Sequence, residues 1–149
     1  MGSWAVAGGG SVMAFDTTCA ETSLNFVDQH LTKAVDLTGA ANQGPVKLSQ
    51  TVNLAAGSYL LPFYLGDISG IPDYTLASSV NVLINNAQVG STFSNGAATG
   101  TVNWAPMSVL FSTLVSGPTT VAFSTASLTL DNFTGIENVV LTAVPEPDV

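Results

Sequence analysis

Hydrophobic and polar positions alternate along most of the chain with a period of two residues. The clearest stretch is residues 46–54, where alternate positions form one largely apolar face: Val46, Leu48, Gln50, Val52 and Leu54. The positions between them are polar. Such alternation is typical of a β-strand that buries one of its faces. Residues 58–65 repeat the pattern after Ala56-Gly57, so the two stretches are predicted to form a hairpin with a short turn.

Further short apolar runs follow along the chain, separated by turn residues. The predicted strands are residues 12–15, 34–37, 46–54, 58–65, 80–84, 88–93, 103–114, 119–124 and 136–144. Asn85-Asn86 and Ser116-Gly117-Pro118 are predicted turns. Residues 21–33 carry only a partial helical stripe, so we expect a loop with at most one or two helical turns there. Many short strands with turns between them predict an all-β fold, an antiparallel sandwich or barrel.

The inward positions of these strands, together with the two tryptophans, give the expected hydrophobic core and the extent of the domain. The expected core residues are Trp4, Val52, Leu54, Tyr59, Leu61, Phe63, Val82, Trp104, Phe111 and Phe123. We expect one β-sandwich domain over residues 1–143. Residues 144–149 contain two prolines, which hold an extended path and remove backbone donors, so they are predicted to leave the domain as a tail.

The net charge of the chain excludes some classes of binding partner. The 149 residues include ten carboxylates, two lysines and no arginine, giving a net charge of −8. With so few cations the chain cannot neutralise phosphates, which excludes nucleic acids and anionic membrane surfaces as partners. No apolar run approaches the roughly 18 residues that a membrane span needs.

The sequence offers no recognisable catalytic machinery. Cys19 is the single cysteine and His30 the single histidine, so neither an internal disulfide nor a histidine triad is available. None of the acids lies in a catalytic motif, and the serines lack the Gly-x-Ser-x-Gly pattern. We therefore predict no catalytic residues and a protein that is not an enzyme.

Several segments together resemble a known family. They are Trp4 to Val12, Val35 to Gly39, Leu48 to Val52, Ala56 to Phe63, Gly135 to Val139 and the terminal Val144-Pro145-Glu146-Pro147. In this order they resemble exported bacterial proteins with a PEP-CTERM sorting signal, of the choice-of-anchor type. The resemblance covers nearly the whole chain. It implies a galactose-binding-like jelly roll, similar to carbohydrate-binding modules, and an extracellular or cell-surface location.

The chain departs from this family at both ends. The family's sorting signal continues after Val-Pro-Glu-Pro into a hydrophobic helix and a basic stop, whereas this sequence ends at Val149. The family's domain also opens with a strand of the type Asn-Gly-Ser-Phe-Glu, and only three residues precede Trp4. We therefore expect a mature chain, a truncated chain or one from a relative that lost the anchor, and in each case one without that opening strand.

Two candidate sites follow. The resemblance implies a structural calcium ion at Glu137, with Asp131 close before it, and no other cofactor; the alternative is a pair of acids on a solvated turn. Tyr64 points away from the core by strand parity and Tyr74 lies in a loop beside Pro72, so both are candidates for stacking on a glycan. Either aromatic could equally be an incidental surface residue.

Three functions from different classes remain. The first is a non-catalytic structural module of a cell surface or biofilm matrix that assembles into a homo-oligomer or fibre through sheet edges, with Trp4 to Phe15 as the donated strand. In the alternative to assembly, the Thr17 to Lys33 loop covers the open edge. The second function is a glycan-binding module with a polysaccharide partner. The third is a hydrolase, for which the sequence shows no machinery.

Overall fold

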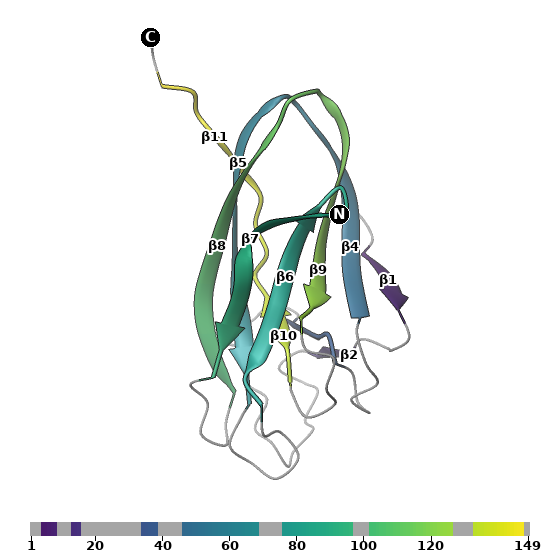
Figure 1. Cartoon of the computed structure of the whole chain (residues 1–149), viewed down its shortest axis with the longest axis vertical. Helices are drawn as coiled ribbons and strands as arrows, with labels where there is room; N and C mark the ends of the chain where they lie inside the picture. Colours follow the sequence, from purple (N-terminus) through teal and green to yellow (C-terminus); the bar gives the residue numbers. More distant parts are fainter. Residues whose placement is uncertain are drawn as a thin grey trace.

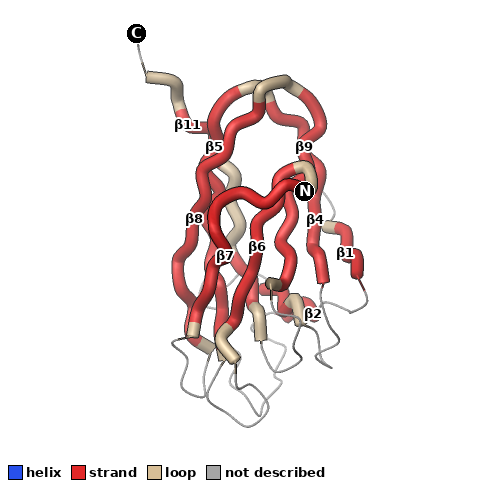
Figure 2. The backbone as a smooth tube through the Cα atoms, in the orientation of Figure 1, coloured by secondary structure: helices blue, strands red, loops and turns tan. Residues whose placement is uncertain are grey.

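The computed structural model describes residues 4–8, 13–15, 34–38, 46–68, 76–96, 102–126 and 133–147. Within these ranges the chain forms eleven β-strands and no helix (Figure 2). All strand pairings are antiparallel, and the strands divide between two sheets. The predicted all-β sandwich is therefore confirmed.

The first sheet has five strands in the order β1-β4-β9-β6-β7 (Figure 1). Their bounds are Ala5–Gly8 for β1, Val46–Leu54 for β4, Gly117–Thr125 for β9, Ser78–Ile84 for β6 and Ala87–Asn95 for β7. β4 has the bounds that its alternating pattern predicts. It pairs along its length with β9, and only its first residues pair with β1 on the other side.

The second sheet is built around β5 (Gly57–Asp67), which pairs on one side with β8 (Asn103–Thr113). The other side of β5 pairs with two short strands, β10 (Gly135–Glu137) and β11 (Thr142–Val144). β3 (Ala34–Asp36) follows β10, and β2 (Met13–Phe15) follows β3. β1 and β2 thus pair within their own chain, so the segment expected to be donated to another copy already belongs to these sheets.

The predicted hairpin at Ala56-Gly57 is wrong. β4 and β5 lie in different sheets, so the chain crosses between the sheets in an arch. A second arch joins β8 to β9 beside the first (Figure 1). The arches are linked, because the backbone N–H of Ala56 donates to Ser116 Oγ at 2.9 Å and Thr113 Oγ1 donates to the carbonyl of Ala55 at 2.8 Å.

The two arches end in the same way. Gly57 and Gly117, the first residues of β5 and β9, have φ angles of 151° and 153°. Residues with a Cβ rarely adopt these angles, so glycine is needed at both positions. The glycine that the sequence pattern assigns to a hairpin turn is therefore the end of an arch.

The single strand predicted over residues 136–144 is also wrong, because this segment contains two short strands. Asn138 has a left-handed φ of 49° and ends β10. Between β10 and β11 the chain runs beside Leu61 to Phe63 of β5. One backbone hydrogen bond joins the two segments there, from the N–H of Val140 to the carbonyl of Pro62 at 3.1 Å. Val139 and Leu141 still pack against the core, which explains the continuous hydrophobic pattern.

The hairpin between β6 and β7 is confirmed. Asn85 and Asn86 form its two-residue turn, with φ angles of 49° and 67°. Two successive positive φ angles are typical of a type I′ turn, whose twist matches that of paired strands. Asn85 also bonds to β9, since its N–H donates to the carbonyl of Thr120 and its Oδ1 accepts from the N–H of Thr120, both at 2.8 Å.

The main core lies between the sheets. Of the predicted core residues, six are buried in this main core: Tyr59, Leu61, Phe63, Val82, Phe111 and Phe123. Val52 and Leu54 are only half-buried. The prediction that Trp4 is a core residue is wrong, because 39% of its surface is exposed. Trp4 directly precedes β1 at the side of the sandwich, where the core is not closed.

Trp104 is buried as predicted, but in a second, smaller cluster. Its ring lies over the backbone of β5 and β10, where a Cβ on Gly66 or Gly135 would come within 2.6 Å and 2.8 Å of ring atoms. Ala34, Ile68 and Phe133 complete the buried part of this cluster. Glycine at these two positions therefore makes the space that the indole fills.

Two further predictions concern the C-terminal tail and membrane-spanning segments. Residues 145–147 of the expected tail are exposed and follow β11 away from the sheets (Figure 1). Within the described ranges we find no helix that is long and apolar enough to span a bilayer.

Candidate functional site

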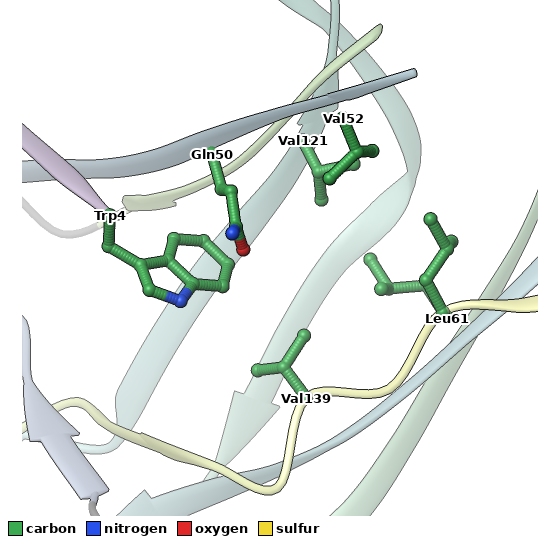
Figure 3. Close-up of a pocket in the computed structure, with 7 residues that line it drawn as sticks. Trp4, Gln50, Val52, Leu61, Val121 and Val139 are labelled. Atoms are coloured by element: carbon green, nitrogen blue, oxygen red, sulfur yellow. The ribbon is translucent and has the colours of Figure 1, made fainter. Parts of the chain in front are cut away.

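One side of the sandwich is open. β1 pairs with residues 46–49 of β4, and the rest of that edge of β4 has no strand partner among the described residues. On the facing sheet, residues 138–141 lie outside regular strand pairing. A cavity of about 180 Å³ lies between these two segments, lined by Trp4, Gln50, Val52, Leu61, Val121, Val139 and Leu141 (Figure 3).

Trp4 forms one wall of this cavity. Its ring centroid lies 6.2 Å from that of Phe123, with the ring planes tilted by 42°, so one part of the indole contacts the core. The remaining 39% of the side chain is exposed. An indole fixed in this way presents a rigid apolar face and one N–H donor to whatever enters the cavity.

Gln50 is the polar residue of this wall. Its amide points from β4 into the cavity beside Trp4, while Val139 and Leu61 point into it from the opposite sheet (Figure 3). No hydrogen bond joins the Gln50 amide to another residue in the described part of the chain. Both its donor and its acceptor are therefore available to a ligand.

A second cavity, of about 350 Å³, adjoins the first and shares Trp4, Gln50 and Val139 with it. Its lining is more polar, because it includes Glu137 and Asn138. We refer to the two adjoining cavities as the Trp4 cleft. The cleft combines an aromatic wall, an apolar floor and a few polar groups, which is the usual composition of a small-molecule site.

Sequence reasoning missed both Trp4 and Gln50 as site residues. The signal for Gln50 is its place on the inward face of β4, between Leu48 and Val52. A polar side chain at an inward position indicates that the core is open to solvent there, because burying an amide without partners is costly. Trp4 gave no comparable signal, since a tryptophan beside a strand is more often part of a core.

The predicted calcium site is described only in part. Asp131 lies outside the described residues. Glu137 is 1% exposed, at the end of β10. Asp36 is equally buried on the neighbouring β3, opposite Gly135, and its Oδ1 accepts from the backbone N–H of Thr38 at 2.8 Å and from Thr38 Oγ1 at 2.6 Å.

Two buried carboxylates thus lie on neighbouring strands, because Asp36 is opposite Gly135, two residues before Glu137. Thr134 directly precedes β10, and its buried hydroxyl has no hydrogen-bond partner in the described part of the chain. Carboxylates suit a hard cation such as calcium, and Glu137 and Asp36 are the described residues that would hold it. The described ranges contain no group of three or more histidine, cysteine or acidic side chains, so the ion stays a prediction.

The predicted glycan-stacking pair is not brought together within the described residues. Tyr74 lies outside them. Tyr64 faces away from the main core as its parity predicts, but it is half-buried and packs against the Trp104 cluster. Much of its ring is thus used in packing.

Comparison with solved structures identifies the fold. A family 61 carbohydrate-binding module in complex with β-1,4-galactotriose matches with a TM-score of 0.63 and 16% identity, over 95% of this chain and 88% of that one. A family 22 xylan-binding domain from Paenibacillus barcinonensis matches with a TM-score of 0.61 and 13% identity, over 96% and 86%. The fold is that of the carbohydrate-binding jelly rolls.

A family 35 carbohydrate-binding module from Clostridium thermocellum matches over 95% of this chain and 99% of that one, with a TM-score of 0.56 and 13% identity. At such identities the likeness establishes the architecture only. Neither a family model nor a curated protein matches the sequence.

Proposed function

We propose that this protein is a non-catalytic carbohydrate-binding module that holds a polysaccharide in the Trp4 cleft. The observation that carries the proposal is the half-exposed indole of Trp4 at the mouth of an apolar cavity, with the Gln50 amide directed into the same space. The jelly-roll likeness to carbohydrate-binding modules supports it. A glycan-binding role at Tyr64 and Tyr74 has less support, because Tyr64 packs against Trp104.

The physical basis is the two-sided character of a sugar ring. The C–H groups on one face of the ring pack against an aromatic surface, and the hydroxyls around its edge require donors and acceptors. Trp4 supplies the aromatic surface, and Gln50 and Asn138 supply the donors and acceptors. The ligand is a neutral glycan, because the net charge of −8 repels uronate or sulfate groups.

Calorimetric titration with a panel of soluble polysaccharides tests the proposal. The panel contains xylan, galactan, mixed-linkage glucan and chitin oligomers. We expect at least one to bind, and Trp4→Ala to weaken that binding by tenfold or more, as loss of an aromatic anchor does. The matched control is Leu114→Ala, which removes a 93% exposed apolar side chain at the arches and leaves binding unchanged. Binding to no member of the panel, or undiminished binding by Trp4→Ala, would contradict the proposal.

A structural role in self-association is the second candidate, and one observation favours it. Leu60 and Leu110 are direct neighbours on β5 and β8, and they are 38% and 63% exposed. Exposed apolar neighbours of this kind mark contact surfaces. Sedimentation velocity compares the oligomeric state of the protein with that of the double variant Leu60→Ser/Leu110→Ser. An oligomer that dissociates in the double variant supports this role, and a monomeric parent protein excludes it.

We also propose that the protein is exported and acts outside the cell or on its surface. The Val-Pro-Glu-Pro terminus and the resemblance to PEP-CTERM proteins support this location. A polysaccharide-binding role also fits it. Fractionation of the native host, followed by immunodetection, would place the protein in the medium or on the envelope if the proposal holds.

A further inference from the structure

The two halves of the Trp4 cleft differ in chemistry. Apart from Trp4 and Gln50, the 180 Å³ cavity is lined entirely by aliphatic side chains: Val52, Leu61, Val121, Val139 and Leu141. Leu61 and Val121 belong to the main core, so this cavity reaches into the interior. The 350 Å³ cavity instead contains Glu137 and Asn138, and it shares Trp4 and Gln50 with the first.

An ordinary sugar hydroxyl does not suit the apolar half. A hydroxyl buried among these aliphatic groups would lose its hydrogen bonds to water, which is unfavourable when no partner replaces them. Gln50 is the one side-chain amide in this half. A group that enters it favourably is therefore mostly apolar and carries a single polar atom near Gln50.

An acetyl group has this composition. Its methyl group matches the aliphatic floor, and its carbonyl oxygen accepts a hydrogen bond from the Gln50 amide. We propose that the Trp4 cleft is selective for acetylated neutral sugars, with the acetyl methyl in the 180 Å³ cavity and the sugar ring against Trp4. This inference rests on the proposed function and adds to it the substrate class.

The polar half suits the rest of such a ligand. Because Trp4 lines both cavities, a ring stacked on the indole extends its acetyl substituent one way and its hydroxyls the other. Asn138 and Gln50 are the neutral hydrogen-bonding side chains on that second side. The amide of Gln50 thus lies where it contacts the acetyl carbonyl or the ring edge, and Trp4 fixes the plane of the ring.

Two oligosaccharide series with the same β-1,4 backbone provide the test. Titration calorimetry compares N-acetylglucosamine oligomers with cello-oligosaccharides of equal length, which lack the acetamido group. In a second pair, acetylated xylan is compared with the same sample after mild alkaline deacetylation. We expect the acetylated member of at least one pair to bind tenfold or more tightly, a difference typical of a filled apolar pocket.

A variant assigns the preference to this cleft. Gln50→Met keeps the side-chain length and removes the amide, so it should reduce the preference for the acetylated ligand at least threefold. Gln88→Met, an exposed position on β7, is the matched control and keeps the full preference. Should Gln50→Met fail to fold, Val139→Thr places a hydroxyl in the apolar floor at nearly constant volume and is expected to lower acetyl preference in the same way.

The outcomes separate the two proposals. Equal affinity within both pairs, or tighter binding of a 6-deoxy or methylated sugar, overturns the acetyl assignment while Trp4-dependent glycan binding still stands. A preference that survives both Gln50→Met and Val139→Thr also overturns it. The absence of Trp4-dependent binding to any polysaccharide overturns the proposed function itself.

Discussion

Phe63 lies in the main core between the two sheets, and it is 1% exposed. Its ring makes edge-to-face contacts with Phe93 at 5.3 Å and with Phe123 at 5.0 Å, both from the facing sheet. Phe63→Ala should lower the free energy of unfolding by about 3–5 kcal/mol, through lost burial and the cavity left behind. Urea denaturation measures the change. Leu110→Ala, at a 63% exposed position, is the control and should cost less than about 0.5 kcal/mol.

Gly66 and Trp104 form a second residue-scale test. A Cβ on Gly66 would lie 2.6 Å from the Trp104 ring, so Gly66→Ala should destabilise the protein by about 1–3 kcal/mol through overpacking. In the double variant with Trp104→Leu, adding the alanine should cost much less than it does beside the indole. Thermal melts of the four proteins of this cycle decide the matter; additive effects would show that the indole does not fill the space above Gly66.

Single residues also show what a sequence pattern can and cannot predict. Parity correctly placed Phe63 inward and Tyr64 away from the main core. It could not show that Tyr64 meets a second apolar cluster, because that cluster gathers residues from four separate segments. The match to a tryptophan position of the resembled family placed Trp4 in the core, but burial depends on whether neighbouring strands close around a residue. β1 ends its pairing at Ser49, so nothing in the described sheets covers the indole fully.

At the scale of elements, the β6–β7 turn allows a matched comparison. Asn85 and Asn86 both have left-handed φ angles, which glycine adopts more readily. Asn85 Oδ1 accepts a hydrogen bond from the backbone N–H of Thr120 at 2.8 Å, whereas Asn86 Oδ1 accepts one from the flexible side chain of Lys47, at Nζ, at 3.0 Å. Asn85→Gly should therefore be less stable than Asn86→Gly by about 1 kcal/mol. Equal melting temperatures would show that the turn does not depend on the side-chain bond from Asn85 to β9.

Element boundaries were more predictable than element partners. The alternation over residues 46–54 reproduces β4, because a period of two records which side chains face the core. The same alternation arises in a hairpin and in an arch, since both keep inward residues inward. A hairpin and an arch differ in the partner of β5, which is β4 in a hairpin and the distant β8 in the arch. The local hydrophobic pattern does not determine which strand becomes the partner, and the hairpin prediction was wrong for this reason.

At the scale of the whole molecule, calcium is the testable cofactor. If an ion binds the folded protein near Glu137 and Asp36, excess calcium raises the melting temperature by mass action and EDTA lowers it. Glu137→Gln should abolish the calcium response, while Glu146→Gln, an exposed acid on the tail, should preserve it. Scanning calorimetry measures both, and identical melts in calcium and EDTA would show that the site does not exist.

The favoured function also changed, from a structural module to a glycan-binding module. The resemblance implied a jelly roll similar to carbohydrate-binding modules, so glycan binding was among the alternatives. The cleft itself could not be predicted, because Trp4, Gln50 and Val139 are separated by up to 135 positions and meet only in the folded sandwich.

The paired arches also dictate an order of folding. β4 pairs with β9 from Leu54 opposite Gly117 to Lys47 opposite Ser124, so this pairing joins segments that lie far apart along the chain. The β6–β7 hairpin can form early, whereas the first sheet has to close long loops, which slows folding. A chain emerging N-terminus first cannot complete that sheet until Thr125 is available. Because Phe123 of the main core lies in β9, the core between the two sheets also closes only at that stage.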